Sequence, residues 1–214
     1  MDLKKTPPYQ KHIDCGAKII DFCGWALPLE YGSQLGEAKS VRTNCGLFDA
    51  SHMGQFRIAG PRAFGFLQNL VTNDLSLIEK GRMQYNLFLN AGGGILDDLM
   101  VYNLGESFLC VVNASNIEKV FKWLQDNKEA DVEIIDESPD TALLSLQGPT
   151  AHLVMEGVLK KKLDDVKYMC FIEENLEGRQ ALISRSGYTA EDGFEIYTPS
   201  NDTGFWWDLI LKEG

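Results

Sequence analysis

A glycine turn followed by an apolar run with two adjacent carboxylates constrains the fold of this chain most. Residues 92–102 have the sequence GGGILDDLMVY, and an apolar run of this length after such a turn predicts a buried or half-buried strand. Side chains alternate between the two faces of a strand, so Asp97 and Asp98 lie on opposite faces, each among apolar neighbours. The pattern therefore predicts that at least one of these carboxylates faces an apolar interior.

A carboxylate in such a place is a candidate for chemistry. Burying it is unfavourable unless it is paired or hydrogen-bonded, and burial changes a pKa in ways that active sites use. A second interpretation fits the same residues: an edge strand with one solvated acid and one acid that caps a turn. The pattern alone leaves both interpretations open.

Composition excludes several classes of protein. The 214 residues are 44% hydrophobic and 24% charged, as is typical of a globular protein, and the net charge of −11 argues against nucleic acid as a partner. The first residues lack the apolar core of a secretory signal, and no apolar stretch approaches membrane-spanning length. The five cysteines lack C-x-x-C spacing and the three histidines are scattered, so we expect no metal site, no membrane association and a cytoplasmic protein.

Apolar periodicity and turn residues predict an α+β fold with antiparallel sheets and packed helices, including a ferredoxin-like unit. A hairpin is predicted at 83–89 and 95–102 around the turn at 90–94. Leu35, Ala38 and Val41 are expected on the inner face of a helix at 33–44 capped by Ser33. An extended apolar segment is predicted at 17–29, with bends at Gly24 and Pro28. The remaining predicted strands are 55–59, 108–112, 132–135, 142–146, 181–184 and 194–198. The remaining predicted helices start at Gly60-Pro61 (Phe64, Leu67, Leu70 and Val71 inward), at 113–115, after Pro149 and at 201.

Several polar side chains are candidate site residues, each with an ordinary structural alternative. His52 is either a general base or a residue that orders its loop. Asn113 either caps a helix or uses its amide to hold a heteroaromatic ring, because an amide offers a donor and an acceptor together. Glu195 either accepts two parallel hydrogen bonds from an aminopyrimidine edge or faces solvent. Met53 and Tyr85 line either a ligand or the core.

A set of short motifs in order along the chain carries a family resemblance. They are FCGW at 22–25, PLEY at 28–31, VRTNCGLFD at 41–49, SHM at 51–53, GGILDDL at 93–99, VVNA at 111–114, LQGP at 146–149 and GYT at 187–189. Together they resemble the N-terminal portion of the T-protein family of the glycine cleavage system, the tetrahydrofolate-dependent aminomethyltransferases. The resemblance covers essentially the whole chain.

The resemblance implies a reaction and a site. An aminomethyl group on the lipoyl arm of H-protein is captured by N5 of tetrahydrofolate, giving 5,10-methylenetetrahydrofolate and ammonia. Asp97 is implied as the catalytic residue, with a pKa set by its apolar strand face. Folate-binding residues implied with it are Met53, Tyr85, Asn113, Tyr188 and Glu195. No metal or prosthetic group is implied.

The resemblance also implies a domain organisation. Residues 1–53 and 140–214 are expected to form one subdomain, which ends here at a helix, and residues 54–139 the ferredoxin-like subdomain. Family chains continue into a G-x-G-A-R-D-x-x-R-x-E-x-G segment and a further β-domain, which this sequence lacks. We therefore expect an N-terminal fragment or a split half, with a second polypeptide as partner. The aromatic face of the last helix, with Phe205 and Trp206, is then expected to be exposed.

Two other functions are alternatives. One is a non-catalytic folate-binding module related to iron–sulfur assembly factors, although their K-G-C-Y-x-G-Q-E signature is not found. The other is a demethylase that acts on a sulfonium compound with folate as methyl acceptor.

Overall fold

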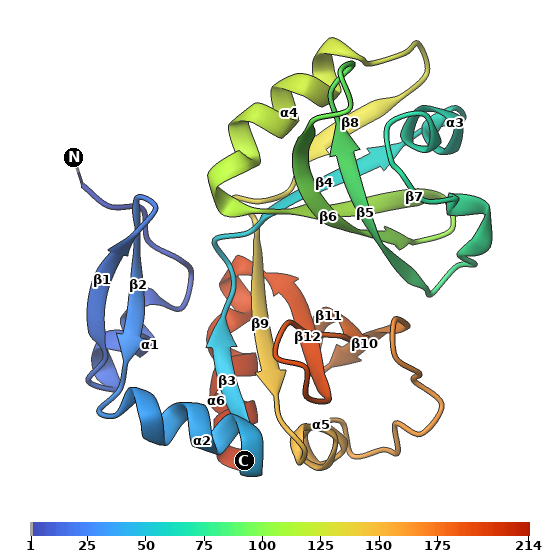
Figure 1. The fold of residues 1–214 in the computed structure, drawn as a ribbon. Coiled ribbons are helices and arrows are strands. Elements are labelled where there is room, and N and C mark those ends of the chain that lie inside the picture. Colours follow the sequence, from blue (N-terminus) through green and yellow to red (C-terminus); the bar gives the residue numbers. More distant parts are fainter. Residues whose placement is uncertain (1) are drawn as a thin grey trace. The chain divides into compact units, whose positions relative to one another are not determined.

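The chain folds into two units, and the computed structural model describes residues 2–214. Met53–Pro139 form one unit, which we call the inserted unit. Met1–His52 and Asp140–Gly214 together form the other, which we call the split unit. Figure 1 shows that each unit combines antiparallel sheet with helices. The predicted α+β class is therefore confirmed.

The inserted unit contains a five-stranded antiparallel sheet with the strand order β5-β6-β7-β4-β8 (Figure 1). Its succession of elements is the βαββαβ pattern of a ferredoxin-like unit with one additional edge strand, β5. The predicted hairpin forms, and in its turn Asn90 Oδ1 accepts hydrogen bonds from the backbone N–H groups of Gly92 and Gly94. The elements are β4 (Gly54–Ala59), α3 (Ala63–Gln68), η1 (Leu75–Leu77), β5 (Met83–Leu89), β6 (Ile95–Asn103), β7 (Ser107–Val112), η2 (Ala114–Asn116), α4 (Ile117–Asp126) and β8 (Glu133–Asp136).

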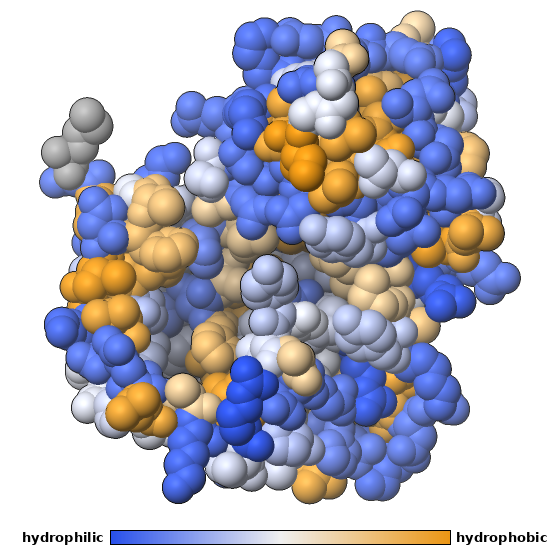
Figure 2. Space-filling model, viewed as in Figure 1, coloured by the Kyte–Doolittle hydropathy of each residue, from blue (hydrophilic) through white to orange (hydrophobic). Residues whose placement is uncertain are grey.

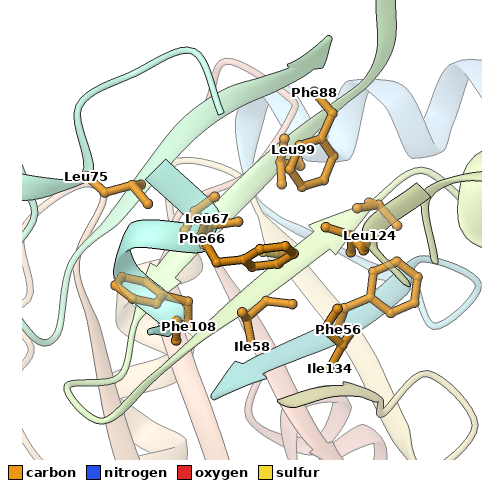
Figure 3. Close-up of a cluster of buried hydrophobic side chains, with 14 of the residues drawn as sticks. Phe56, Ile58, Phe66, Leu67, Leu75, Phe88, Leu99, Phe108, Leu124 and Ile134 are labelled. Carbon is orange, nitrogen blue, oxygen red and sulfur yellow. The ribbon is translucent and has the colours of Figure 1, made fainter. Parts of the chain in front are cut away.

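The core of the inserted unit lies between this sheet and its two helices (Figure 3). Alternate residues of β4, Phe56 and Ile58, are fully buried there, and α3 contributes Phe66 and Leu67. Burying each such side chain stabilises the fold by about 1.5–3 kcal/mol. Phe64 was expected to face inward and does not: it is exposed.

The start of α3 also differs from the prediction. We expected the helix to begin at Gly60-Pro61, but it begins at Ala63. Gly60 has φ +102°, and a Cβ at this position would lie 2.3 Å from the carbonyl oxygen of Asp131. Residue 60 must therefore be glycine, and the turn at residues 60–62 closes where the Ala63 N–H donates to the Gly60 carbonyl at 3.0 Å, so the helix begins only at Ala63.

The split unit contains a second five-stranded antiparallel sheet, of order β10-β11-β12-β9-β3, and a separate β1–β2 hairpin (Figure 1). Strand β3 pairs with β9 in the register Gly46↔Gln147, so the two sequence segments of the unit share one sheet. The elements are α1 (Tyr9–Asp14), β1 (Lys18–Phe22), β2 (Trp25–Glu30), α2 (Gln34–Thr43), β3 (Gly46–Asp49), β9 (Thr141–Gln147), α5 (Ala151–Leu159), β10 (Phe171–Leu176), β11 (Arg179–Arg185), β12 (Gly193–Pro199), η3 (Ser200–Asp202) and α6 (Thr203–Glu213).

The last helix, α6, is part of the core of the split unit. Trp206, Trp207 and Ile210 are buried against α5 and the sheet. The expected exposure of its aromatic face is therefore wrong. The apolar face is already covered by α5, whose residues Val154 and Val158 belong to the same cluster.

Helix α2 is confirmed in its position and its cap but not in its inner face. Ser33 Oγ accepts a hydrogen bond from the backbone N–H of Gly36, as an N-cap does. Of the three residues expected to face inward, only Val41 is buried, whereas Ala38 is exposed and Leu35 is 86% exposed.

Candidate functional site

The paired carboxylates lie on β6, which is an interior strand of its sheet. Strand β6 lies between β5 and β7, so the alternative of an edge strand is wrong. Asp97 shares its face with the core residues Leu99 and Val101 and is 4% exposed. Asp98 lies on the opposite face and is half-buried. The expectation that at least one acid faces an apolar interior is therefore confirmed.

Three N–H groups hold the carboxylate of Asp97. The backbone N–H of Asn113 donates to Oδ2 at 3.0 Å, and the side-chain Nδ2 of Asn113 donates to Oδ1 at 3.0 Å. Asn116 Nδ2 donates a further short hydrogen bond to Oδ1. Donors of this kind offset the desolvation of a buried carboxylate and fix its orientation.

The Asn113 amide also contacts the second carboxylate. Its Nδ2 lies 2.8 Å from Asp98 Oδ1, while the phenol of Tyr85 donates to Asp98 Oδ2 at 3.2 Å. Asn113 can contact both carboxylates because it directly follows β7, and β7 pairs with β6 through Leu99↔Val112. The structure thus brings Tyr85, Asp97 and Asn113 together at this end of the sheet.

Two acceptor positions of this cluster have no donor within the described residues. A carboxylate accepts about four hydrogen bonds, and Asp97 accepts three within the described part of the chain. The Nδ2 of Asn113 contacts the two carboxylates and the Asp98 carbonyl, so within residues 2–214 the amide oxygen is the atom that remains as an acceptor. The cluster therefore suits a ligand that presents N–H donors.

Met53 is half-buried and directly precedes β4. The register Gly54↔Val112 places Met53 and Asn113 at the same end of the β4–β7 ladder. Met53 is thus at the end of the sheet where the cluster of Tyr85, Asp97 and Asn113 lies.

Two of the predicted site residues belong to the split unit. Glu195 lies on β12 opposite Ser184 of β11 and Ser145 of β9, both of which are buried. Its Oε2 accepts a hydrogen bond from Ser186 Oγ at 2.7 Å. Glu195 is half-buried in this polar set. Tyr188 lies in the loop between β11 and β12, and its side chain is 99% exposed.

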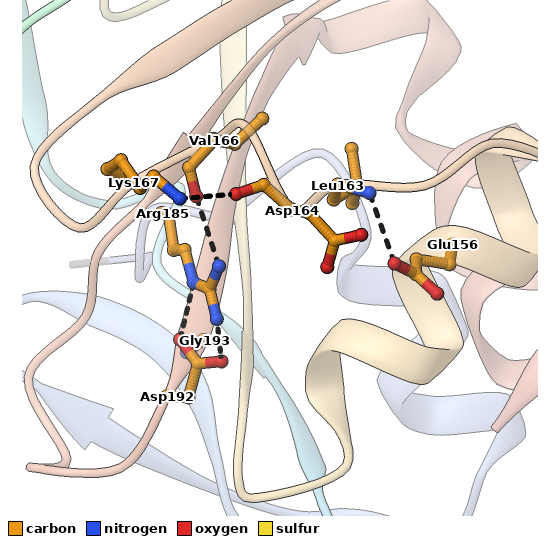
Figure 4. A network of polar contacts seen from close by, with 8 residues as sticks. All are labelled: Glu156, Leu163, Asp164, Val166, Lys167, Arg185, Asp192 and Gly193. Atoms are coloured by element: carbon orange, nitrogen blue, oxygen red, sulfur yellow. Dashed lines mark hydrogen bonds and ion pairs between the residues drawn. The ribbon is translucent and has the colours of Figure 1, made fainter.

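The ends of the loop that carries Tyr188 are joined by an ion pair (Figure 4). Arg185 Nε and Nη2 donate to the two carboxylate oxygens of Asp192 at 2.9 and 2.6 Å. The hydrogen bonds from Arg185 lower the pKa of Asp192 below its ordinary value, and they raise that of the Arg185 guanidinium. Bidentate pairing of this kind fixes the distance between the loop ends.

His52 is half-buried and packs against an aromatic ring. His52 Nδ1 has no hydrogen-bond partner within residues 2–214, and its ring packs edge-on against Phe22 at 5.7 Å between centroids. Burial lowers the pKa of His52 below 6.5, an effect that nearby Asp49 opposes. The lack of a partner for Nδ1 offers no support for His52 as a general base.

A different histidine, His12, lies at the centre of a buried polar cluster. Its Nδ1 lies 2.7 Å from the hydroxyl of Tyr31, and its Nε2 lies 2.9 Å from Asp49 Oδ2. Burial acts to raise the pKa of Asp49, but hydrogen bonds from His12 and Ser51 outweigh it and the pKa is lowered. Burial raises the pKa of Tyr31. This cluster joins α1, the end of β2 and β3.

Within the described residues, no group of three or more His, Cys, Asp or Glu side chains is arranged to hold a metal ion. No helix in residues 2–214 is both long and apolar enough to span a bilayer. On the face shown in Figure 2, hydrophilic residues cover most of the surface and apolar residues form separate patches.

Sequence reasoning missed two residues that contact the site residues. Asn116 contacts Asp97, and Ser186 contacts Glu195. A signal for Asn116 existed, because a polar residue three positions after Asn113 at a helix start lies on the same side of the chain. Ser186 had no comparable signal, since its contact depends on the pairing of β11 with β12.

Comparison with known proteins gives consistent results. The chain matches the family described as GCVT N-terminal domain over residues 8–214. It is 44% identical to an aminomethyltransferase of Halothermothrix orenii over 213 residues, which are 99% of this chain and 60% of that protein. The chain therefore spans about 60% of the length of the curated relatives it matches.

Solved structures show the same fold. The crystal structure of glycine cleavage system aminomethyltransferase T from Bartonella henselae matches with a TM-score of 0.90 at 35% identity, over 98% of this chain and 57% of that chain. The heterotetrameric sarcosine oxidase of Corynebacterium sp. U-96 matches with a TM-score of 0.64 at 14% identity, over 98% and 94% of the two chains, and shares the fold only.

Proposed function

Because this chain belongs to the GCVT N-terminal domain family, we propose that it carries the folate site and the catalytic carboxylate of a tetrahydrofolate-dependent aminomethyltransferase of the glycine cleavage system. The observation that carries the proposal is the buried, fully oriented carboxylate of Asp97, with Asn113 holding both of its oxygens. The curated relatives that cover the chain are aminomethyltransferases, which supports the same reaction class.

The proposed reaction transfers one carbon atom. The methylene carbon of an aminomethyl group on a lipoyl sulfur forms bonds to N5 and N10 of tetrahydrofolate. Its bonds to the amino nitrogen and to sulfur break, so the products are 5,10-methylenetetrahydrofolate, ammonia and the lipoyl thiol. The protons from N5 and N10 leave with these two products. The donor of the carbon is the lipoylated H-protein, which is the proposed protein partner.

In this proposal Asp97 stabilises positive charge that develops on the transferred carbon and folate nitrogens. The remaining acceptor position of its carboxylate can also take an N–H proton. A positioned carboxylate that handles a proton contributes about 10²–10⁴-fold to a rate. Asn116 and Asn113 keep the carboxylate in one orientation, so little reorganisation is needed during the reaction.

The proposed pterin contacts follow from the atoms that remain available. The Asn113 amide oxygen accepts an N–H of the pterin, and Glu195 accepts from the aminopyrimidine edge, with Ser186 orienting its carboxylate. Tyr85, Tyr188 and Met53 contribute aromatic and apolar surface, which is the usual complement of a few polar groups in a small-molecule site. We also propose a cytoplasmic location, in keeping with five cysteines that are all free.

Two measurements test the proposal. Calorimetry with tetrahydrofolate is expected to give saturable heat with the 214-residue chain. Synthesis of methylenetetrahydrofolate from aminomethyl-loaded H-protein is then assayed with this chain alone and with the segment of a relative that follows the matched region. Folate binding without turnover in both assays would favour the non-catalytic folate-binding module. The absence of heat with tetrahydrofolate would overturn the proposal.

A further inference from the structure

One buried side chain, that of Gln147, holds the loop of residues 186–192 from within. Gln147 is the last residue of β9 and is 1% exposed. Its Nε2 donates to the backbone carbonyl of Ser186 and to Ser145 Oγ, both at 3.0 Å. Its Oε1 accepts a hydrogen bond from Thr189 Oγ1 at 2.9 Å. Both amide hydrogens and one lone pair are thus used on this loop and its neighbouring strand.

Two glycines allow the loop backbone to approach this amide. A Cβ on Gly187 would lie 1.9 Å from Gln147 Oε1, and a Cβ on Gly193 would lie 2.4 Å from Gln147 Nε2. Neither separation is possible for a real side chain without moving the amide. The Gln147 side chain therefore fills the space between the two ends of the loop.

The loop is held by contacts of the residues around Tyr188, since Tyr188 itself is not buried. Tyr188 is almost fully exposed, so its own packing does not fix it. Ala190 has φ +62°, a left-handed conformation that L-residues adopt only where surrounding contacts enforce it. Arg42 contributes from outside, because its Nη1 donates to the Thr189 carbonyl and to Glu191. These contacts hold the residues on both sides of Tyr188.

We propose that Gln147 is a positioning residue for folate binding, a role that rests on the proposed folate site. Its amide holds the Ser186 carbonyl and the Thr189 hydroxyl, on either side of Tyr188. The same contact sets Ser186, whose hydroxyl orients Glu195. Both proposed pterin contacts of the split unit are thereby arranged before the ligand binds, which reduces the ordering that binding must impose.

The experiment compares Gln147→Leu with a matched control, Thr198→Val. Thr198 is buried in the same unit on β12, and its Oγ1 donates to the Gln180 carbonyl, away from the loop. Each variant therefore loses buried hydrogen bonding, but only Gln147→Leu releases the loop. Tetrahydrofolate binding is measured by calorimetry on the 214-residue chain, and amide hydrogen exchange is measured at residues 187–191.

We expect Gln147→Leu to weaken tetrahydrofolate binding about tenfold and to speed exchange in the loop, whereas Thr198→Val changes neither. Thr189→Val, which removes one of the contacts from the loop side, is expected to act in the same direction more weakly and serves if Gln147→Leu does not fold. If Gln147→Leu and Thr189→Val both keep the wild-type affinity and the wild-type exchange rates of the loop, the role of Gln147 is overturned and the folate site is left intact. If the unaltered chain gives no heat with tetrahydrofolate, the proposed function fails, and the inference fails with it.

Discussion

Asn113 binds both carboxylate oxygens of Asp97, through its backbone N–H to Oδ2 and its side-chain amide to Oδ1, each at 3.0 Å. A single residue thus fixes the rotation of a buried carboxylate about its terminal bond. Both terminal atoms of residue 97 must therefore be hydrogen-bond acceptors. A side chain of the same shape with only one acceptor atom cannot satisfy these donors.

The substitution Asp97→Asn replaces one acceptor oxygen by a donor that faces the N–H groups of Asn113 or Asn116. We expect activity to fall by about 100-fold or more, because the charge is removed, and the free energy of unfolding to fall by about 1–3 kcal/mol, because buried donors lose their acceptor. The measurements are methylenetetrahydrofolate synthesis and denaturant unfolding. Asp126→Asn, at an exposed ion pair on α4, is the control and should change neither. Activity within a few-fold of the unaltered chain would show that the role of Asp97 is wrong.

Gly193→Ala is expected to disturb the loop of residues 186–192 through Gln147. The new methyl group must displace the Gln147 amide, since it would lie 2.4 Å from Nε2. In a Gln147→Ala background the same space is empty, so Gly193→Ala should destabilise the chain less than it does alone. Thermal unfolding of the two single variants and the double variant measures this coupling, which we expect to be about 0.5–3 kcal/mol. Strictly additive effects would contradict the close approach.

The lowered pKa of His52 predicts a pH dependence of stability. Burial holds the folded-state pKa below 6.5, so the unfolded chain binds more protons than the folded chain between these two values. The contribution of neutral, buried His52 to the free energy of unfolding is therefore complete above pH 6.5. It is lost as the pH falls from 6.5 toward the lower pKa of the folded state. Melting temperatures measured between about pH 7.5 and pH 5 should fall less steeply for His52→Gln. Parallel profiles for the two proteins would show that His52 is not responsible.

The buried cluster around His12 predicts a large effect of one substitution on stability. His12→Leu removes the partner of both Asp49 and Tyr31 in a place where the side chains of His12 and Asp49 are fully buried. We expect a loss of about 3–5 kcal/mol in the free energy of unfolding, as when one member of a buried pair is removed. The control is Lys11→Met, next in the chain, which breaks a surface ion pair with Asp208 and should change stability by about 1 kcal/mol or less. Equal effects of the two substitutions would contradict the importance of the cluster.

Local signals predicted the elements whose determinants are local. The turn at 90–94 with its flanking alternation identified β5 and β6, and Ser33 identified the start of α2. By contrast β3 was missed, because its four residues pair only with β9, about 100 residues away. Strand β10 and the six-residue α1 were missed as well, since each is short and depends on partners elsewhere in the split unit.

Of the candidate site, the sequence predicted the buried carboxylate but not the contacts that hold it. The adjacent acids in an apolar run indicated a buried carboxylate, and the structure buries Asp97. The contact of Asn113 with both acids depends on the β6–β7 register and could not be obtained from the sequence. The roles of Met53, Tyr85, Asn113, Tyr188 and Glu195 toward folate remain predictions that the variants above and ligand binding must test.

The pairing of β3 with β9 also has a consequence for how the polypeptide acquires its structure. When β3 leaves the ribosome, its neighbour in the sheet has not yet been synthesised, whereas all strands of Met53–Pro139 are complete before β9 emerges. Contacts of high sequence separation form slowly, and domains generally fold as units during synthesis. Nascent chains should therefore protect β6 and β7 from proteolysis earlier than β3, although β3 is made first.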